Sequence, residues 1–231
     1  MKKIYRISDK SNPFPLEFNY ITREICLKNF VDVFGLDDLI IIADNCTEDT
    51  VNFVKSLQIN DIRCTQLGNS GTLKYAFEIC YAEFKDDDIV YFSDDDFLYL
   101  PEPEKYITEG LSIAEYVSLY DHLDKYLDNN QNPFIRNGGE ITRVVKTAST
   151  HWKYPNSIGL VCATTVAELK RDKEILYRYN FRGSVTNSFA TTLELIHIGR
   201  RIATPLPGRA TACDKFPSPF VDWKKVAQKY E

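Results

Sequence analysis

Short apolar runs alternate with amphipathic segments over the first hundred residues. Each run is continuous, which is typical of a strand buried on both faces of a parallel sheet. Such strands are predicted at residues 3–8, 39–43, 61–66 and 89–92. The segments between them carry apolar residues at helical spacing and predict helices at residues 19–34, 47–57 and 68–84. The β-α-β-α-β-α-β order predicts an α/β fold with a doubly wound, mostly parallel sheet flanked by helices.

The second half of the chain is patterned less regularly. Helices are predicted at residues 104–115, 165–177 and 185–198, with a short one from residue 222. Strands are predicted at residues 116–120, 141–146 and 159–163, a loop or hairpin tip at 128–133, and an irregular tail from residue 205. No internal repeat and no long linker divides the sequence, which predicts one domain over residues 1–231.

Composition narrows the functional class. The 231 residues are 44% hydrophobic and 26% charged, as in a soluble globular protein, and the net charge of −5 argues against nucleic acid as a partner. No apolar run approaches the roughly 20 residues of a membrane span, and the N-terminus lacks the apolar region of a signal peptide. The six cysteines form no Cys-x-x-Cys pair, so a zinc site is not expected. We therefore expect a cytoplasmic protein without a transmembrane segment.

Three consecutive carboxylates, Asp94, Asp95 and Asp96, follow the fourth predicted strand directly. In open α/β sheets the ligand crevice lies at this end of the strands. Carboxylates held so close repel one another, and a hard divalent cation with oxygen ligands relieves the repulsion. A solvated acidic turn is the alternative for such a triplet, but the buried strand before it favours a site for Mg²⁺ or Mn²⁺.

Two further strand ends converge on the triplet. One carries Asp44, and the other is the loop after the first strand. The turn Gly68–Gly71 opens a predicted helix, whose free amides and dipole favour an anion such as a diphosphate. Neither a Walker loop nor a Gly-x-Gly-x-x-Gly sequence is present. The pattern indicates a nucleoside diphosphate held through a metal. The residues expected to bind it are Arg6, Ser8, Asp9, Asp44, Arg63, Asn69, Gly71, Lys74, Asp94 and Asp95.

The order of Asp44-Asn45, Thr47-Glu48-Asp49-Thr50, Gly68–Gly71 and Phe92–Asp96 resembles the nucleotide-sugar half of GT-A-fold glycosyltransferases, particularly family 2. Asp94 and Asp96 match the Asp-x-Asp motif of that family. The resemblance covers residues 1–100 and implies that Asp94 lies near the ribose or metal, and that Asp96 ligates Mn²⁺ or Mg²⁺ at the diphosphate of a sugar donor. It also implies that Asp44 contacts the base or ribose. Residues 101–231 would form the acceptor side.

An inverting transfer needs a carboxylate that takes the proton of the acceptor hydroxyl. Asp172 resembles the acidic position of the family near a helix end, while Asp121 and Asp214 are competing candidates and a solvated Asp172 is equally plausible. His151 and Trp152 suggest an aromatic platform for a sugar of the acceptor, which could be a glycan, a lipid-linked group or a protein. A core tryptophan beside a capping histidine is the alternative.

Two departures from the family bear on activity. Ala212 stands where related enzymes often carry a histidine as third metal ligand, and Asn187 lies where acidic residues are usual. A nucleotide-sugar-binding domain that has lost its chemistry is therefore one alternative function. A sugar nucleotidyltransferase is another, although residues 8–12 lack the glycines usual in the loop after its first strand.

Overall fold

The computed structural model describes residues 1–127, 132, 134–135, 139–181 and 186–231. Most of the loop expected at residues 128–133, and the first residue of the helix expected at 185–198, lie outside the described residues.

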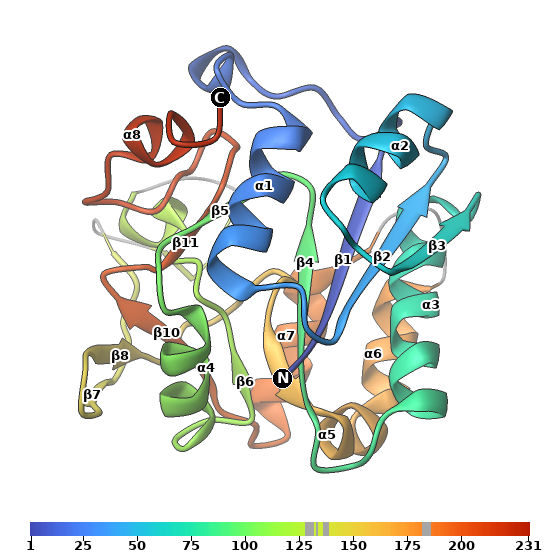
Figure 1. Ribbon diagram of the computed structural model, residues 1–231. Helices are drawn as coiled ribbons and strands as arrows, with labels where there is room; N and C mark the ends of the chain where they lie inside the picture. The colour runs from blue at the N-terminus through green and yellow to red at the C-terminus, as the bar shows by residue number, and fades with distance from the viewer. Residues whose placement is uncertain (128–131, 133, 136–138, 182–185) are drawn as a thin grey trace.

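A nine-stranded sheet runs through the described part of the chain and confirms the predicted fold class (Figure 1). Strands β1, β2, β3 and β4 are parallel to one another, and β6 is parallel to β10. The pairs β4–β9, β6–β9, β8–β10 and β7–β8 are antiparallel. From one edge to the other, the strands are β3 (Asp61–Thr65), β2 (Leu39–Asp44), β1 (Lys2–Ser8), β4 (Ile89–Asp94), β9 (Ala163–Thr165), β6 (Tyr116–Val117), β10 (Ile202–Leu206), β8 (His151–Lys153) and β7 (Val144–Lys146).

Helices cover both faces of the sheet because the four parallel strands are apolar on both faces (Figure 1). Tyr5 and Ile41 pack toward α1 (Arg23–Phe34), whereas Ile4 and Phe92 pack toward α3 (Gly68–Glu83). The first face also carries α2 (Glu48–Ser56) and α4 (Pro103–Leu111), and the second carries α5 (Val166–Arg171), α6 (Lys173–Asn180) and α7 (Ser188–His197). Helix α8 (Trp223–Ala227) packs on α1 and on β5 (Phe97–Tyr99).

Several element boundaries differ from those predicted. The helix expected from residue 19 begins at Arg23, because the Thr22 hydroxyl accepts the amide of Ile25 and caps the helix there. Residues 16–18, just before the predicted helix, form a 3₁₀ turn, and a second such turn spans Leu123–Tyr126. The helix expected at 104–115 ends at Leu111.

The second half differs most from its prediction. The strands expected at 116–120 and 141–146 are shorter, and the one expected at 159–163 begins only at Ala163. The helix expected at 165–177 divides into α5 and α6 around Asp172. The tail expected to be irregular from residue 205 contains the last two residues of β10 and all of β11 (Ala210–Ala212), which pairs with β5 in a second sheet. These short strands carry too few residues to show a period.

Among the described residues, no helix is both long enough and apolar enough to cross a membrane.

Candidate functional site

A cavity of about 490 Å³, the strand-end cavity, opens at the carboxyl ends of β1, β2 and β4. In the strand register, Ser8 of β1 lies opposite Asp44 of β2, and Arg6 of β1 lies opposite Asp94 of β4. Polar side chains from three strands therefore meet at the carboxyl ends of these strands. Open α/β sheets bind their ligands at the carboxyl ends of their strands. The cavity is lined by Arg6, Ile7, Ser8, Lys10, Ser11, Asn12, Asp44, Asn45, Gly68, Asn69, Thr72, Asp94, Asp95 and Asp96.

Arg6 and Asp94 form a bidentate ion pair inside the cavity. The guanidinium donates from Nε to Oδ1 at 2.7 Å and from Nη2 to Oδ2 at 2.8 Å. Its remaining nitrogen, Nη1, donates to the carbonyl of Asn69 at 3.0 Å and to the hydroxyl of Thr72 at 3.2 Å. A planar guanidinium suits such two-point contact with a carboxylate. Both oxygens of Asp94 are therefore engaged by the protein itself.

Asp95 ties the loop after β1 to helix α1. Its Oδ2 accepts the amide of Ser8 at 2.9 Å, the hydroxyl of Ser11 at 3.1 Å and Nε of Arg23 at 3.1 Å. Burial raises the pKa of Asp95, while the Ser8 amide and the Arg23 charge act in the opposite direction. This carboxylate serves the architecture of the cavity wall.

Asp96 is the least satisfied carboxyl of the triplet. Its Oδ1 is buried and has no hydrogen-bond partner within the described residues, although the residue as a whole is only partly buried. Burial raises its pKa to about 8, with further contributions from the charges of Asp94, Asp95 and Asp214. Near neutral pH a large part of this carboxyl is therefore protonated.

Asp44 caps the helix that was expected to receive a diphosphate. Its Oδ1 accepts the amide of Leu67 at 2.6 Å and the hydroxyl of Thr65 at 2.8 Å, and its Oδ2 accepts the amide of Gly68 at 3.1 Å. Burial alone would raise the pKa of Asp44, but these hydrogen bonds lower it below the ordinary value. The two amides at the start of α3 are thus occupied by a carboxylate of the protein.

Asp9, expected to contact the donor, caps α2 and does not line the strand-end cavity. Its Oδ2 accepts the amide of Thr47 at 2.6 Å, and its Oδ1 accepts the hydroxyl of Thr50 at 2.8 Å. Burial would raise the pKa of Asp9, yet the hydrogen bonds from Thr47 and Thr50 lower it.

We expect Asp9→Ala to lower the free energy of unfolding by about 1 kcal/mol, as loss of a helix cap does. Urea unfolding would measure the change. Asp9→Asn keeps an acceptor oxygen and should lose less than the alanine variant. Equal stability of wild type and Asp9→Ala would show that the cap contributes nothing.

The other expected donor contacts are placed unequally. Asn69 lines the strand-end cavity. Arg63 instead pairs with Asp61 at 2.9 Å and Glu83 at 2.6 Å, and Lys74 pairs with Glu78 at 3.7 Å, outside the lining. Gly71 also lies outside it. A side chain there would meet Leu67, because a Cβ added at Gly71 would lie 2.8 Å from the Cβ of Leu67.

The residues present do not form a ready site for the expected Mn²⁺ or Mg²⁺. Both oxygens of Asp94 are held by Arg6, and Ala212 has no ligand atom in its side chain. Within the described ranges, no group of three His, Cys, Asp or Glu side chains is placed to hold a metal ion. Asp96 alone of the triplet offers a buried carboxylate oxygen without a partner in this part of the chain.

A cavity of about 310 Å³, the tail cavity, meets the strand-end cavity at Asp96, which lines both. Ala212 and Asp214 bring the C-terminal tail into its wall, and Ser188 brings the start of α7. Asp214 accepts the amide of Phe216 at 2.7 Å through Oδ1, which orients its carboxylate. Residues from the second half of the sequence thus face the triplet.

Asp172, expected to be the base, lies at the opposite end of the strands, where β4 begins. Helix α5, which ends just before it, follows β9 at the edge where β4 begins (Figure 1). Arg200 donates to its Oδ1 at 2.7 Å, and the hydroxyl of Tyr116 donates to its Oδ2 at 3.0 Å. The carboxylate is buried and lines neither cavity, so the assignment of Asp172 as base has to be corrected.

Asp121, a competing candidate, is buried and pairs with Lys153 at 2.7 Å. The hydroxyl of Tyr126 donates to its Oδ2 at 2.6 Å. It does not line the tail cavity, whereas Asp214, the other competitor, does.

Trp152 is a core residue and offers no face to a sugar. Its side chain is fully buried, and its Nε1 donates to the hydroxyl of Thr147 at 2.8 Å. The indole packs so closely on Gly110 that an added Cβ there would lie 2.8 Å from it. His151 is exposed on the same strand, and neither residue lines the tail cavity. The expected platform is therefore corrected to a structural role for Trp152.

Sequence reasoning missed several residues that line or shape the strand-end cavity. Lys10, Ser11 and Asn12 lie in a loop whose sequence has no distinctive motif, and Arg23 reaches Asp95 from the start of α1. The direct adjacency of Arg6 and Asp94 follows from the pairing of β1 with β4, which sequence spacing does not define.

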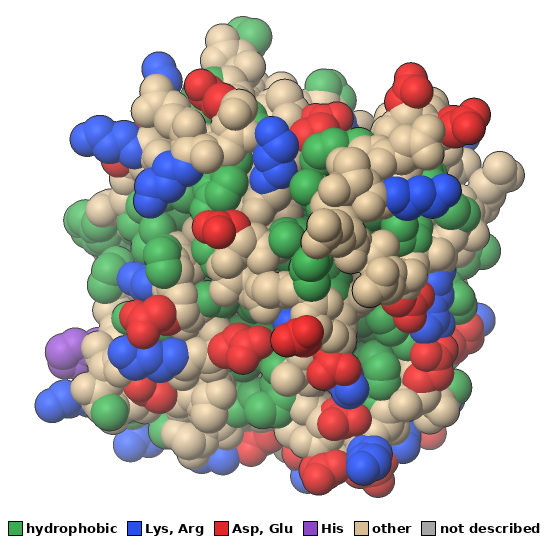
Figure 2. Space-filling view, viewed as in Figure 1, with side chains coloured by type: hydrophobic (Ala, Val, Ile, Leu, Met, Phe, Trp, Pro, Cys, Tyr) green, Lys and Arg blue, Asp and Glu red, His purple; other side chains and the backbone are tan. Residues whose placement is uncertain are grey.

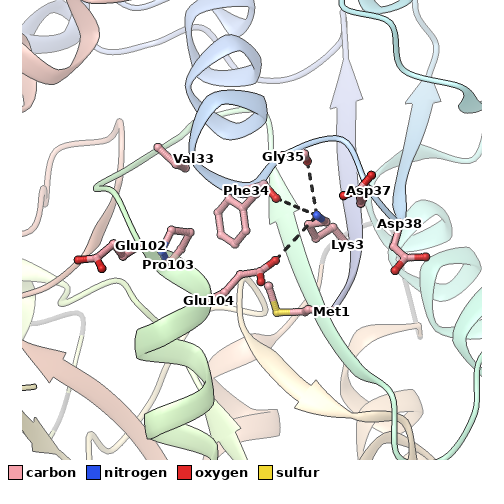
Figure 3. A pocket seen from close by; sticks show the side chains of 10 residues that line it. All are labelled: Met1, Lys3, Val33, Phe34, Gly35, Asp37, Asp38, Glu102, Pro103 and Glu104. Atoms are coloured by element: carbon pink, nitrogen blue, oxygen red, sulfur yellow. Dashed lines mark hydrogen bonds and ion pairs between the residues drawn. The ribbon is translucent and has the colours of Figure 1, made fainter. Parts of the chain in front are cut away.

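A third cavity, of about 620 Å³, lies at the amino-terminal edge of the parallel strands. The buried Lys3 ammonium donates to the carbonyl of Phe34 at 2.8 Å and lies 3.9 Å from Glu104 (Figure 3). Burial lowers the pKa of Lys3. Asp37 and Asp38 line this cavity and are exposed. In the view of Figure 2, acidic side chains gather in the lower part of the surface. The Lys3 ammonium is satisfied by carbonyl groups at the end of α1, which gives Lys3 a structural role beside this cavity.

No family model matches the chain, and no curated protein matches its sequence. Among solved structures, it is similar to residues 1–349 of TarS from S. aureus, with a TM-score of 0.51 and 15% identity over 88% of this chain and 58% of that one. It thus spans less than two thirds of that structure.

Two further structures match nearly full length. One is 4-diphosphocytidyl-2C-methyl-D-erythritol synthase, with a TM-score of 0.52 and 13% identity over 100% of this chain and 98% of that one. The other is the enzyme of that name from Anaerococcus prevotii DSM 20548, with a TM-score of 0.51 and 14% identity over 99% and 95%. At these identities the likeness concerns the fold alone, and the chain has a GT-A-like α/β fold with a mostly parallel central sheet flanked by helices.

Proposed function

We propose that this protein transfers a sugar from a nucleoside-diphosphate sugar to an acceptor hydroxyl. The observation that carries the proposal is the meeting of two cavities at Asp96. The strand-end cavity lies where this fold binds nucleotides, and the tail cavity offers a second substrate a place beside it. A transfer between two substrates needs this arrangement, because both must reach one point.

Asp214 is the proton acceptor in this scheme. The acceptor oxygen attacks the anomeric carbon, the bond from that carbon to the diphosphate oxygen breaks, and its electron pair leaves with the nucleoside diphosphate. The hydroxyl proton passes to Asp214, which lies in the tail cavity and is oriented by the amide of Phe216. Asp96 lies where the two cavities meet, beside the reacting groups.

Two other functions remain as alternatives. The full-length likeness to the diphosphocytidyl synthases favours a nucleotidyltransferase on fold alone, but residues 8–12 lack glycine. Ala212 and Asn187 favour a binding domain without catalysis. Asn187 caps α7 by accepting the amide of Ala190 at 3.0 Å, which gives it a structural role in place of an acidic one.

Product analysis distinguishes these functions. With a panel of UDP-, GDP- and CDP-sugars and mixed acceptor hydroxyls, we expect release of nucleoside diphosphate. Asp214→Asn should lower that release by about 100-fold, as loss of a general base does, while nucleotide binding persists. Release of pyrophosphate from nucleoside triphosphate and sugar phosphate would identify a nucleotidyltransferase. Nucleotide binding without either product would identify a binding domain.

A further inference from the structure

The carboxylate triplet is compensated from within the chain. The repulsion between its charges was the physical reason to expect a divalent cation. Arg6 neutralises Asp94 through two hydrogen bonds, and Arg23 lies 3.1 Å from Asp95. Two guanidinium groups thus stand where the charge of one divalent ion was expected.

The geometry also leaves few ligand atoms for a metal. Mg²⁺ requires close to six oxygen ligands in octahedral arrangement and usually takes one or two of them from protein carboxylates. Each oxygen of Asp94 already accepts a hydrogen bond from Arg6, whose third nitrogen is anchored to Asn69, so a metal ion at Asp94 would have to share its carboxylate with a guanidinium of the same charge sign. Ala212, which lines the tail cavity together with Asp96, has no ligand atom in its side chain.

Lys10 differs from the other cation that lines the strand-end cavity. Arg6 is paired, whereas the described residues offer Lys10 no carboxylate ion pair. Its Nζ donates to Oδ1 of Asn45 at 3.2 Å, across the ends of β1 and β2. Its backbone amide donates to the hydroxyl of Ser8 at 3.2 Å, which fixes the loop. An ammonium has three N–H donors, so two remain for a ligand.

We propose that Lys10 binds the diphosphate of the nucleotide and that this binding needs no divalent cation. The inference rests on the proposed function, because it takes a nucleoside diphosphate as the ligand. Lys10 supplies positive charge at the cavity mouth, and Arg6 holds Asp94 so that its carboxylate does not repel the phosphates. The Lys10 ammonium thus takes the place of a metal ion at a site whose residues do not supply a third metal ligand.

Calorimetric titration of the whole protein with UDP, GDP, CDP and ADP tests this inference, in EDTA and then in Mn²⁺ or Mg²⁺. We expect the affinity for the preferred nucleotide to agree within about threefold between these conditions. Lys10→Ala should weaken binding about tenfold or more, the expected loss of one hydrogen bond to a charged group. Lys10→Arg should restore most of the affinity. Lys55→Ala removes an exposed lysine from α2 and is the matched control.

The outcomes separate this inference from the proposed function. Nucleotide binding that appears only with Mn²⁺ or Mg²⁺ would overturn the inference and leave the proposed function standing. Unchanged affinity of Lys10→Ala would overturn it too. If none of the four nucleotides binds under either condition, both proposals fail. Lys10 is exposed, and circular dichroism of the variants confirms that a loss of binding is not a loss of fold.

Discussion

Asp96→Asn is expected to unfold at higher urea concentration than the wild type at pH 8, although the two should be nearly equal at pH 4. Oδ1 of the Asp96 carboxyl is buried without a partner in the described structure, and desolvation raises the pKa of Asp96 to about 8 from an ordinary value of 3.8. Asparagine has nearly the same shape and carries no charge at any of these pH values.

The direction follows from proton linkage. Between pH 3.8 and pH 8 the unfolded chain has lost the Asp96 proton, whereas the folded protein retains it. The wild type therefore loses stability as pH rises through this window, by up to about tenfold in the unfolding equilibrium constant per pH unit. From pH 5 to pH 8 the loss is a few kcal/mol, on the order of a substantial part of total stability. The asparagine variant lacks this contribution.

Urea unfolding of both proteins at pH 5, 6.5 and 8 measures the effect. Other titrating groups contribute similarly to both proteins, so the difference between their unfolding free energies isolates Asp96. A difference that stays constant across the three pH values would mean that the pKa of Asp96 is ordinary and that its carboxylate is solvated or paired.

Trp152→Ala is expected to lower the free energy of unfolding by about 3–5 kcal/mol, the range for removal of a fully buried large aromatic side chain. The indole fills the space beside Gly110 and Val117, and its nitrogen is satisfied by Thr147. Removal leaves a cavity in the core where β8 pairs with β10. Chemical denaturation followed by circular dichroism measures the loss.

His151→Ala is the matched control, because it changes the adjacent and exposed residue of the same strand. A surface substitution of this kind should change stability by no more than about 0.5 kcal/mol. If Trp152→Ala proved as mild as His151→Ala, the indole would not be part of the core, and its role on the acceptor side would have to be considered again.

The first half of the fold, over residues 1–100, could be predicted from the sequence because its strands are long and apolar and its helices have a clear period. The convergence of Asp44 and Asp94 followed from that order alone. The hydrogen bonds that the polar side chains make at these strand ends could not be predicted from the sequence. Helix caps such as Asp9 depend on loop geometry, and the pair of Arg6 with Asp94 depends on which strands are neighbours.

The second half of the fold was harder to predict from the sequence for a physical reason. Strands of two to five residues, such as β6 and β10, show too little periodicity to be distinguished from loops. The sequence suggests a platform at Trp152 because it does not predict β10, the strand that pairs with β8 and helps to bury the indole. A motif position suggests a base at Asp172, although long-range pairing with Arg200 decides the role of that carboxylate.

The position of β4 between β1 and β9 joins the two halves more firmly than two adjoining lobes would be joined. A fragment that ended near residue 100 would turn β4 into a bare edge, with its amide and carbonyl groups on one side unpaired and its apolar faces partly uncovered. Exposed edges of this kind recruit other chains and aggregate. Ligand binding at the strand-end cavity is therefore better altered by substitutions around that cavity than by exchange of whole halves between proteins.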